Sequence, residues 1–245
     1  MSLGPGPRIH LDRPLAAGDA FELPVAQARH VQVLRLQPGD ALTLFNGVGG
    51  EWRARVRLMG RAAVGVEVEA HVAADRELAR RVTLAFGMPA NERMDALVEK
   101  ATELGVAAIQ PLVCERSVLR LSGERAARRQ LHWQGVAVAA SEQCGRTRVP
   151  EVRAVQALRG WLEGPGAARA GDARRFVLSL DAALCWNAAI AGPEGTALVV
   201  LSGPEGGLTA AEEEAARGAG YAPVSLGPRV LRADTAPLAV LAWCV

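Results

Sequence analysis

Hydrophobic and polar residues alternate with a period of two along two segments near the start of the chain, residues 51–59 and 64–72. This alternation is typical of β-strands with one buried face and one solvated face. A third short strand is predicted over residues 41–45, and residues 26–36 carry a helical pattern. Several short strands joined by turns favour a closed sheet, so we predict a small β-barrel domain over residues 1–73.

The pattern changes after a charged stretch at residues 73–80. Apolar runs typical of buried strands follow at residues 82–87, 106–113, 175–180, 197–202 and 222–227. Helical patterns lie between or after these runs, most clearly over residues 91–105 and 124–143, and residues 164–175 read as a loop. Strands that alternate with helices predict an α/β domain with a parallel sheet, here over residues 74–245.

Composition narrows the class of protein further. Half of the 245 residues are hydrophobic, so a globular protein is expected, and no apolar run is long enough to span a membrane. The four cysteines form no CxxC pair, which argues against a zinc site or a disulfide framework. We therefore expect a cytoplasmic protein that uses neither a membrane nor a metal.

The net charge of +2 says little, but its distribution is uneven. Residues 114–153 hold eight arginines against four glutamates. Arginine forks suit phosphate recognition, so this segment is compatible with nucleic-acid binding. A proteome rich in arginine would give the same bias, and most single arginines are solvated surface residues.

Two loops rich in glycine and proline follow neighbouring predicted strands. They are LSGPEGG at residues 201–207 and LGPRVLRADTA at residues 226–236. Ligands of open α/β sheets bind beyond the carboxyl ends of the strands, so the two loops predict one pocket. Neither loop has the spacing of a P-loop or of a GxGxxG dinucleotide site, and either one alone reads as a tight turn.

The residues after these loops predict helix starts. Thr209 and Glu212 have the spacing of a capping box, and Asp234 and Thr235 can cap the last helix. That helix, PLAVLAWCV at residues 237–245, is apolar on every side. We expect it to be buried, either within its own fold or against a second subunit.

Taken together, these segments resemble the RsmE-type family of the SPOUT superfamily of methyltransferases. The matching residues keep the family order along nearly the whole chain: HVQVLRLQPGD with LFNG (30–47), EKATELGV (99–106), PLVCERS (111–117), ASEQCGRTRVPEV (140–152), GPEGG (203–207) and LGPRVLRADTA (226–236). Two departures are Asp234, where the family often has glutamate, and His10, where it usually has an aromatic residue.

The resemblance implies an RNA-binding PUA-like barrel followed by a SPOUT domain with a deep trefoil knot. It implies a homodimer that binds S-adenosyl-L-methionine in the knot and methylates N3 of a uridine in 16S ribosomal RNA. The sequence leaves open whether the substrate is free rRNA or the assembled small subunit, and our hypothesis is the assembled subunit. The implied cofactor-binding residues are Leu180, Leu201, Ser202, Gly203, Pro204, Glu205, Gly206, Leu226, Gly227, Arg229, Val230 and Leu231.

Other residues are candidates for catalysis and RNA binding. Arg232 can contact phosphate or the target base, or pair with Asp234. Glu205 can lie near the reacting groups, or accept backbone N–H groups and shape its turn. No general base is identified. A basic track for RNA is expected from Arg8, His30, Arg35, Arg116 and Arg146.

Three other functions stay open from the sequence. One is a SPOUT enzyme that methylates transfer RNA or a ribose 2′-hydroxyl, but the barrel and the order of the motifs favour the ribosomal uridine. Another is a non-catalytic RNA-binding protein of ribosome assembly, against which the retained cofactor loops argue. The third is an α/β enzyme for an unrelated small molecule, which would show no affinity for RNA.

Overall fold

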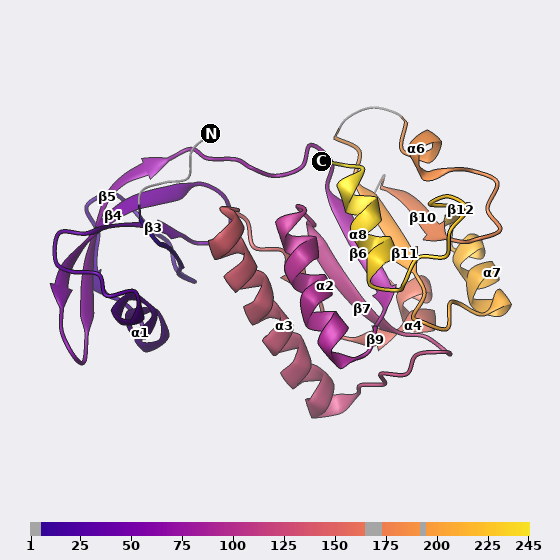
Figure 1. The fold of residues 1–245 in the computed structure, drawn as a ribbon, viewed down its shortest axis with the longest axis horizontal. Helices are drawn as coiled ribbons and strands as arrows, with labels where there is room; N and C mark the ends of the chain where they lie inside the picture. Colours follow the sequence, from indigo (N-terminus) through magenta and orange to yellow (C-terminus); the bar gives the residue numbers. More distant parts are fainter. Residues whose placement is uncertain (1–5, 165–172, 192–194) are drawn as a thin grey trace. The chain divides into compact units, whose positions relative to one another are not determined.

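The computed structural model describes residues 6–164, 173–191 and 195–245 (Figure 1). Most of the loop predicted over residues 164–175 therefore lies outside the described residues. The chain divides into two compact units: Met1–Glu77 with Ser141–Val149, and Leu78–Ala140 with Pro150–Val245. A single boundary after residue 73 is predicted from the sequence, whereas in the structure a second stretch, residues 141–149, belongs to the first unit.

The first unit is built on a five-stranded mixed sheet in the order β1-β3-β4-β5-β2. β1 pairs with β3 in parallel, and the other neighbours are antiparallel. The three strands predicted in this unit are confirmed, and the two three-residue edge strands were not foreseen. The elements are β1 (Arg8–His10), β2 (Ala20–Glu22), α1 (Val25–Val33), β3 (Ala41–Phe45), β4 (Glu51–Met59) and β5 (Val64–Val72).

The alternation along β4 and β5 creates one apolar and one charged face. Val56 and Val66 are paired across the two strands and are fully or almost fully buried in the core of this unit. On the charged face Arg55 pairs with Glu69 at 2.7 Å and Arg57 pairs with Glu67 at 2.5 Å. Glutamates of β5 thus neutralise two of the three arginines of β4.

The second unit is a parallel sheet, which confirms the predicted α/β class. Its order is β12-β10-β11-β6-β7, and both β8 and β9 pair with β7. The strands are β6 (Val82–Gly87), β7 (Ala108–Val113), β8 (Glu151–Val152), β9 (Gln156–Ala157), β10 (Arg174–Leu178), β11 (Leu198–Ser202) and β12 (Ala222–Val224). The helices are α2 (Asn91–Glu103), α3 (Gly123–Cys144), α4 (Leu158–Glu163), α6 (Trp186–Ala189), α7 (Ala210–Gly218) and α8 (Thr235–Ala242).

Because the strands run parallel, the segments that follow β6, β7, β10, β11 and β12 all leave the sheet at one edge, its carboxyl edge. The chain then returns from the edge strand β12 to the middle of the sheet, where α8 packs against α2, β6 and β11 (Figure 1). Within the described residues no helix has the length and apolar character needed to cross a membrane.

Candidate functional site

A cavity of about 560 Å³ opens at the carboxyl edge of the parallel sheet. The ends of β10, β11 and β12 and the segments after them form most of its wall, so the two predicted loops do share one pocket. The predicted residues that line it are Leu180, Ser202, Gly203, Pro204, Glu205, Gly206, Leu226, Gly227, Arg229, Val230, Leu231, Arg232 and Arg116.

Leu201 differs from the other residues predicted for this pocket. Its side chain is fully buried in the hydrophobic core of the unit, together with Ala85 and Leu112. Along β11 the side chains alternate between the two faces of the sheet, and that of Leu201 belongs to a packed face. The side chain of Leu201 therefore supports the pocket wall, and contact between its backbone and the cofactor stays a prediction.

The loop after β11 turns so tightly that it contacts itself. A Cβ atom on Gly203 would lie 2.7 Å from the backbone nitrogen of Leu208. Gly207 has a φ of +69°, a conformation that L side chains rarely adopt, and a Cβ there would meet nothing within 4 Å. Closure of the loop therefore requires glycine at position 203, with or without a ligand.

Neighbouring segments hold this loop from two sides. The Arg116 guanidinium, in the segment between β7 and α3, donates to the carbonyl oxygens of Gly206 at 3.1 Å and Leu208 at 3.4 Å. The carboxylate of Glu212 accepts the backbone N–H of Glu115 at 2.8 Å. These bonds fix the loop against the segment that follows β7, so Arg116 acts here as a support of the pocket wall.

Glu205 also bonds to the backbone. Its carboxylate accepts the N–H of Ala90, the residue before α2, at 2.9 Å, and the Arg93 guanidinium lies 4.0 Å away. Of the two roles left open by the sequence, this contact supports the one in which Glu205 shapes its turn. The side chain still borders the cavity, so any contact with a ligand would add to that role.

The cavity wall contains a buried hydroxyl and several charged side chains. The hydroxyl of Ser202 is buried and has no hydrogen-bond partner among the described residues. Asp181 and Glu213 line the cavity beside β10 and α7, whereas Arg93 and Arg116 follow β6 and β7, on the other side of β11. Arg229 and Arg232, after β12, line the cavity on the same side of β11 as Asp181. The wall therefore contains charges of both signs together with an unused hydroxyl.

Sequence reasoning missed two acidic residues of this cavity, Asp181 and Glu213. Ser179 and Asp181 follow β10, and Glu213 lies in the first turn of α7, where the Ser179 hydroxyl donates to it at 3.2 Å. These residues could have been found from their positions in the sequence, because residues just beyond a parallel strand lie at the carboxyl edge of the sheet. Arg93, in the segment that follows β6, was also missed and could have been found in the same way.

The two predicted helix caps have different outcomes. The capping box of α7 is confirmed, since the Thr209 hydroxyl accepts from the Glu212 N–H and the Glu212 carboxylate accepts from the Thr209 N–H. Asp234 occupies the N-cap position of α8, but its side chain makes no capping hydrogen bond. Its Oδ1 atom is buried without a hydrogen-bond partner among the described residues. Within the same residues, Arg232 and Asp234 form no ion pair.

Two of the arginines predicted to contact RNA are buried inside the first unit. Arg8 is 7% exposed and Arg146 is 4% exposed. Arg8 pairs with Glu51 and donates to the Arg146 carbonyl at 3.0 Å, and Arg146 pairs with Glu77. We correct their predicted role, because buried guanidinium groups bound to carboxylates hold strands together and present no charge to RNA.

The other two predicted RNA contacts of the first unit lie on its surface. His30 is exposed on α1, and Arg35 is exposed just after that helix. Arg35 has a φ of 58°, and no other non-glycine residue among those described has a positive φ. Such strained positions cluster at functional sites, which keeps Arg35 a candidate for binding.

Comparison with known proteins gives two family matches in this chain. A model described as an RNA methyltransferase domain matches residues 76–245, and one described as an RNA methyltransferase PUA domain matches residues 23–69. Curated relatives include ribosomal RNA small subunit methyltransferase E of Bacillus subtilis, 30% identical over 90% of this chain and 88% of the relative. The protein of that name from Synechocystis is 34% identical over 90% and 71%.

Solved structures resemble this chain along nearly its whole length. A ribosomal RNA small subunit methyltransferase E from Neisseria gonorrhoeae, bound to S-adenosyl methionine, has a TM-score of 0.87 and 35% identity over 96% of this chain and 95% of that one. A Legionella pneumophila protein solved with the bound cofactor SAM has a TM-score of 0.88 and 32% identity over 96% and 95%.

Proposed function

This chain belongs to the RNA methyltransferase family of ribosomal RNA small subunit methyltransferase E, and from that premise we propose that it methylates N3 of a uridine in 16S ribosomal RNA with S-adenosylmethionine. The observation that carries the proposal is the cavity at the carboxyl edge of the parallel sheet, because its wall combines the family's two loops with a buried, unpaired Ser202 hydroxyl.

The residues of the cavity fit this cofactor. S-adenosylmethionine supplies an electrophilic methyl group on a positively charged sulfonium. The Ser202 hydroxyl and the backbone groups of the loops after β11 and β12 would hold its adenosine part, and the apolar side chains of Leu180 and Leu226 would exclude water. Asp181 and Glu213 bring negative charge to a wall that would receive a cation.

The target base must lose its N3 proton before or during transfer. Arg232 borders the cavity and is exposed, so its guanidinium can stabilise the developing negative charge of the uracil ring. Positioning of the base in line with the methyl group supplies much of the remaining rate. Solvent at the open mouth of the cavity takes the proton in this scheme.

The first unit, which contains the match to an RNA methyltransferase PUA domain, would bring the RNA. Because Arg8 and Arg146 are buried, the candidates in this unit are the exposed His30 and Arg35 at α1. Single-stranded RNA is bound through phosphate contacts and base stacking, for which an imidazole and a guanidinium are suited. We place this activity in the cytoplasm, in agreement with four cysteines that are all free thiols.

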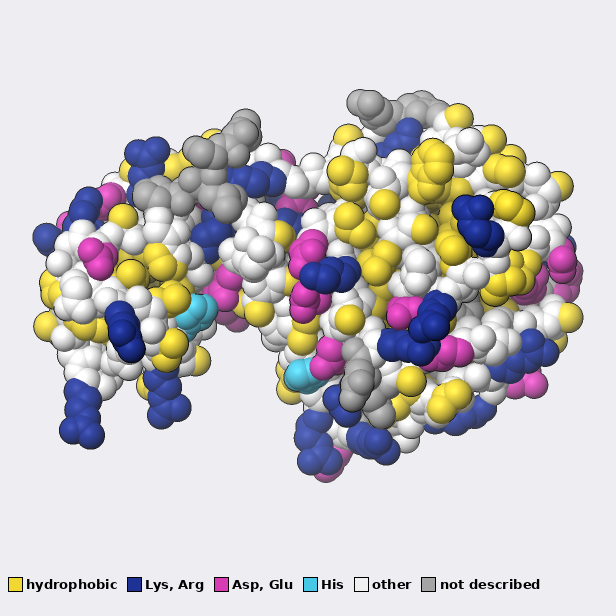
Figure 2. All heavy atoms as spheres, viewed as in Figure 1, with side chains coloured by type: hydrophobic (Ala, Val, Ile, Leu, Met, Phe, Trp, Pro, Cys, Tyr) yellow, Lys and Arg dark blue, Asp and Glu magenta, His cyan; other side chains and the backbone are white. Residues whose placement is uncertain are grey.

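We further propose that the protein is a homodimer and that its chain is knotted. Trp243 is 59% exposed and Val245 is 83% exposed, and Figure 2 shows hydrophobic side chains gathered over α8 and its neighbours. Within one chain α8 is buried on one face only, at Pro237, Val240 and Leu241, so of the two alternatives left open by the sequence a second subunit would cover the other face. The return of the chain from β12 to the sheet centre supports threading through the loop after β11.

The experiment that tests this function starts with titration calorimetry of S-adenosylmethionine. We expect micromolar binding of about one cofactor per subunit, followed by methylation of small ribosomal subunits from cells that lack this chain. Mapping the modified nucleotide by mass spectrometry would identify an N3-methyluridine. Cofactor binding without methylation of small subunits or of protein-free rRNA would contradict the proposal, and light scattering tests the dimer.

A further inference from the structure

A row of arginines follows one side of α3 near the start of the helix. Arg125, Arg128 and Arg129 have the spacing i, i+3 and i+4, which places them side by side on a helix surface. Ala126 and Trp133 point instead into the protein, where they are 9% and 1% exposed. We call the three arginines the basic stripe.

The charge of the basic stripe is hardly compensated. Residues 116–132 contain five arginines and one glutamate, a net charge of +4 in a chain whose total is +2. Among the described residues, Arg125 and Arg129 have no acidic partner, and Arg128 lies 4.0 Å from Glu124 in a pair whose side chains are 77% and 95% exposed. Such exposed pairs contribute little, so the stripe stays available to an anion.

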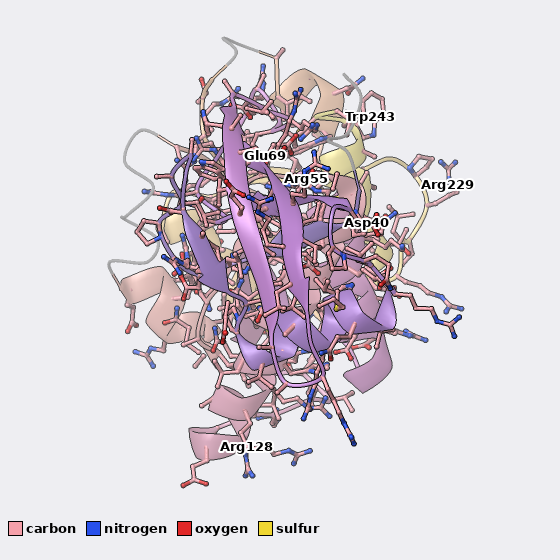
Figure 3. All side chains as sticks on the ribbon, turned by 90° about the vertical axis from the view of Figure 1, so that its left-hand side faces the viewer. Asp40, Arg55, Glu69, Arg128, Arg229 and Trp243 are labelled. Carbon is pink, nitrogen blue, oxygen red and sulfur yellow. The ribbon has the colours of Figure 1, made fainter. Side chains whose placement is uncertain are left out.

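The basic stripe lies at the same edge of the sheet as the cavity. A helix that follows a parallel strand starts where that strand ends, and α3 follows β7. The connecting segment contains Arg120 and also Arg116, which lines the cavity. Figure 2 shows Lys and Arg side chains gathered where α3 begins in Figure 1, and Figure 3 shows Arg128 pointing away from its helix.

We propose that the basic stripe binds backbone phosphates of the RNA that flank the nucleotide held in the cavity. Guanidinium forks match phosphate oxygens, and a row of them on a helix provides several adjacent contacts without reading the bases. The stripe would therefore fix the register of the RNA over the cavity. This inference rests on the proposed function for the identity of the polyanion.

The test replaces all three arginines by glutamine, a good helix former that keeps the length but not the charge of the side chain. Binding of protein-free 16S rRNA is measured as a function of salt concentration. Each phosphate contact on a single strand contributes about 0.7 to the slope of log K against log salt, so the triple variant should lose about 2. The control is Arg159→Gln, an exposed arginine of the same unit that pairs with Glu163 on α4 and does not line the cavity.

Calorimetry with S-adenosylmethionine shows whether the variant is folded, and its affinity should equal that of the wild type. An unchanged salt slope and RNA affinity would overturn the proposal. A loss seen with whole subunits but not with protein-free rRNA would overturn it too, because the partner would then be a ribosomal protein. If the wild type binds rRNA but methylates no subunit, the proposed function fails while the slope still tests the stripe.

Discussion

At the scale of single residues, the same type of side chain is buried and ion-paired at one position and exposed to solvent at another. Arg8 and Arg125 are both arginines in a chain that has 28 basic residues, and the sequence around each gives no sign of its burial. The structure places Arg8 against Glu51, 43 positions away, while Arg125 stays in solvent. Pairing over such distances depends on strand register, which local pattern does not reveal.

Gly87 gives a residue-scale prediction about the pocket. A Cβ atom at this last position of β6 would lie 2.5 Å from both the nitrogen and Cδ of Pro204, so Gly87→Ala must displace the loop after β11. We expect the affinity for S-adenosylmethionine to fall about tenfold or more, a change of about 1.4 kcal/mol, measured by calorimetry.

The matched control for this change is Gly135→Ala, in the middle of α3. There a Cβ atom meets nothing within 4 Å, and the helix should gain about 0.5–1 kcal/mol in its free energy of unfolding. Equal cofactor affinities in the two variants would show that Pro204 is not part of the binding wall.

Arg35 allows strain and function to be separated. Its φ of 58° is costly for a side chain with a Cβ, so Arg35→Gly should raise the free energy of unfolding by about 0.5–1 kcal/mol in urea titrations. If Arg35 contacts RNA, the same variant should bind rRNA more weakly. Arg35→Lys keeps both the strain and the charge and serves as the control. A glycine variant that is less stable than the wild type would contradict this account.

At the scale of secondary structure elements, period and capping predicted most of the fold. The bounds of β3, β4, β5 and β6 agree with the apolar patterns, because each strand has at least five residues and a clear buried face. β8 and β9 have two residues each, too short to show a period, and the four residues of α6 give no helical pattern. The position of the candidate site was predictable from its glycine-rich loops. That Asp181 and Glu213 also line it depends on the order of the strands in the sheet, which local pattern does not reveal.

Cys114, just after β7, reports on the stability of this element. Burial, followed by the negative charge of Glu212, raises the pKa of the Cys114 thiol to about 12. Because the thiolate is the reactive form, alkylation at about pH 8 should modify the exposed Cys185 and leave Cys114 intact, as followed by mass spectrometry. Bound cofactor should slow the modification of Cys114 further, because a ligand that binds the native state makes local opening of the protein rarer. Equal rates at Cys114 and Cys185 would show that the segment after β7 opens freely.

At the scale of the whole molecule, a buried ionic network fastens the stretch 141–149 into the first unit. Arg76 donates to Glu51 at 3.0 Å and to the Gly145 carbonyl at 2.9 Å, and Thr147 donates to the Ala74 carbonyl at 3.1 Å. The predicted boundary missed this arrangement, since none of these partners is close in the sequence. A buried carboxylate shared by two arginines is costly to break from one side.

The pH dependence of stability should reveal this network. Burial alone raises the pKa of Glu51, but hydrogen bonds and charges of Arg76 and Arg8 outweigh it, so the pKa is lowered. Its contribution is therefore full above the unfolded value of about 4.3 and is lost as the pH falls through the lower folded value. We expect Glu51→Gln to cost about 3–5 kcal/mol at pH 7, measured by urea unfolding, with a gap that closes only below about pH 4.

The control for the network is Glu69→Gln, which removes an exposed pair with Arg55 and should change stability by at most about 1 kcal/mol. A gap between the wild type and Glu51→Gln that already narrows above about pH 5 would contradict a lowered pKa of Glu51.

The stretch 141–149 also sets the order in which the protein can be completed during translation. Its residues Gly145, Arg146 and Thr147 bond to groups of the first 77 residues, yet they are synthesised after the whole of α3. Domains generally fold as units while the chain emerges from the ribosome, N-terminal first. Here the hydrogen bonds of the N-terminal unit are completed only by a segment that is synthesised some 70 residues later, so a faster elongation rate would shorten the time that Arg8, Ala74 and Arg76 spend without these partners.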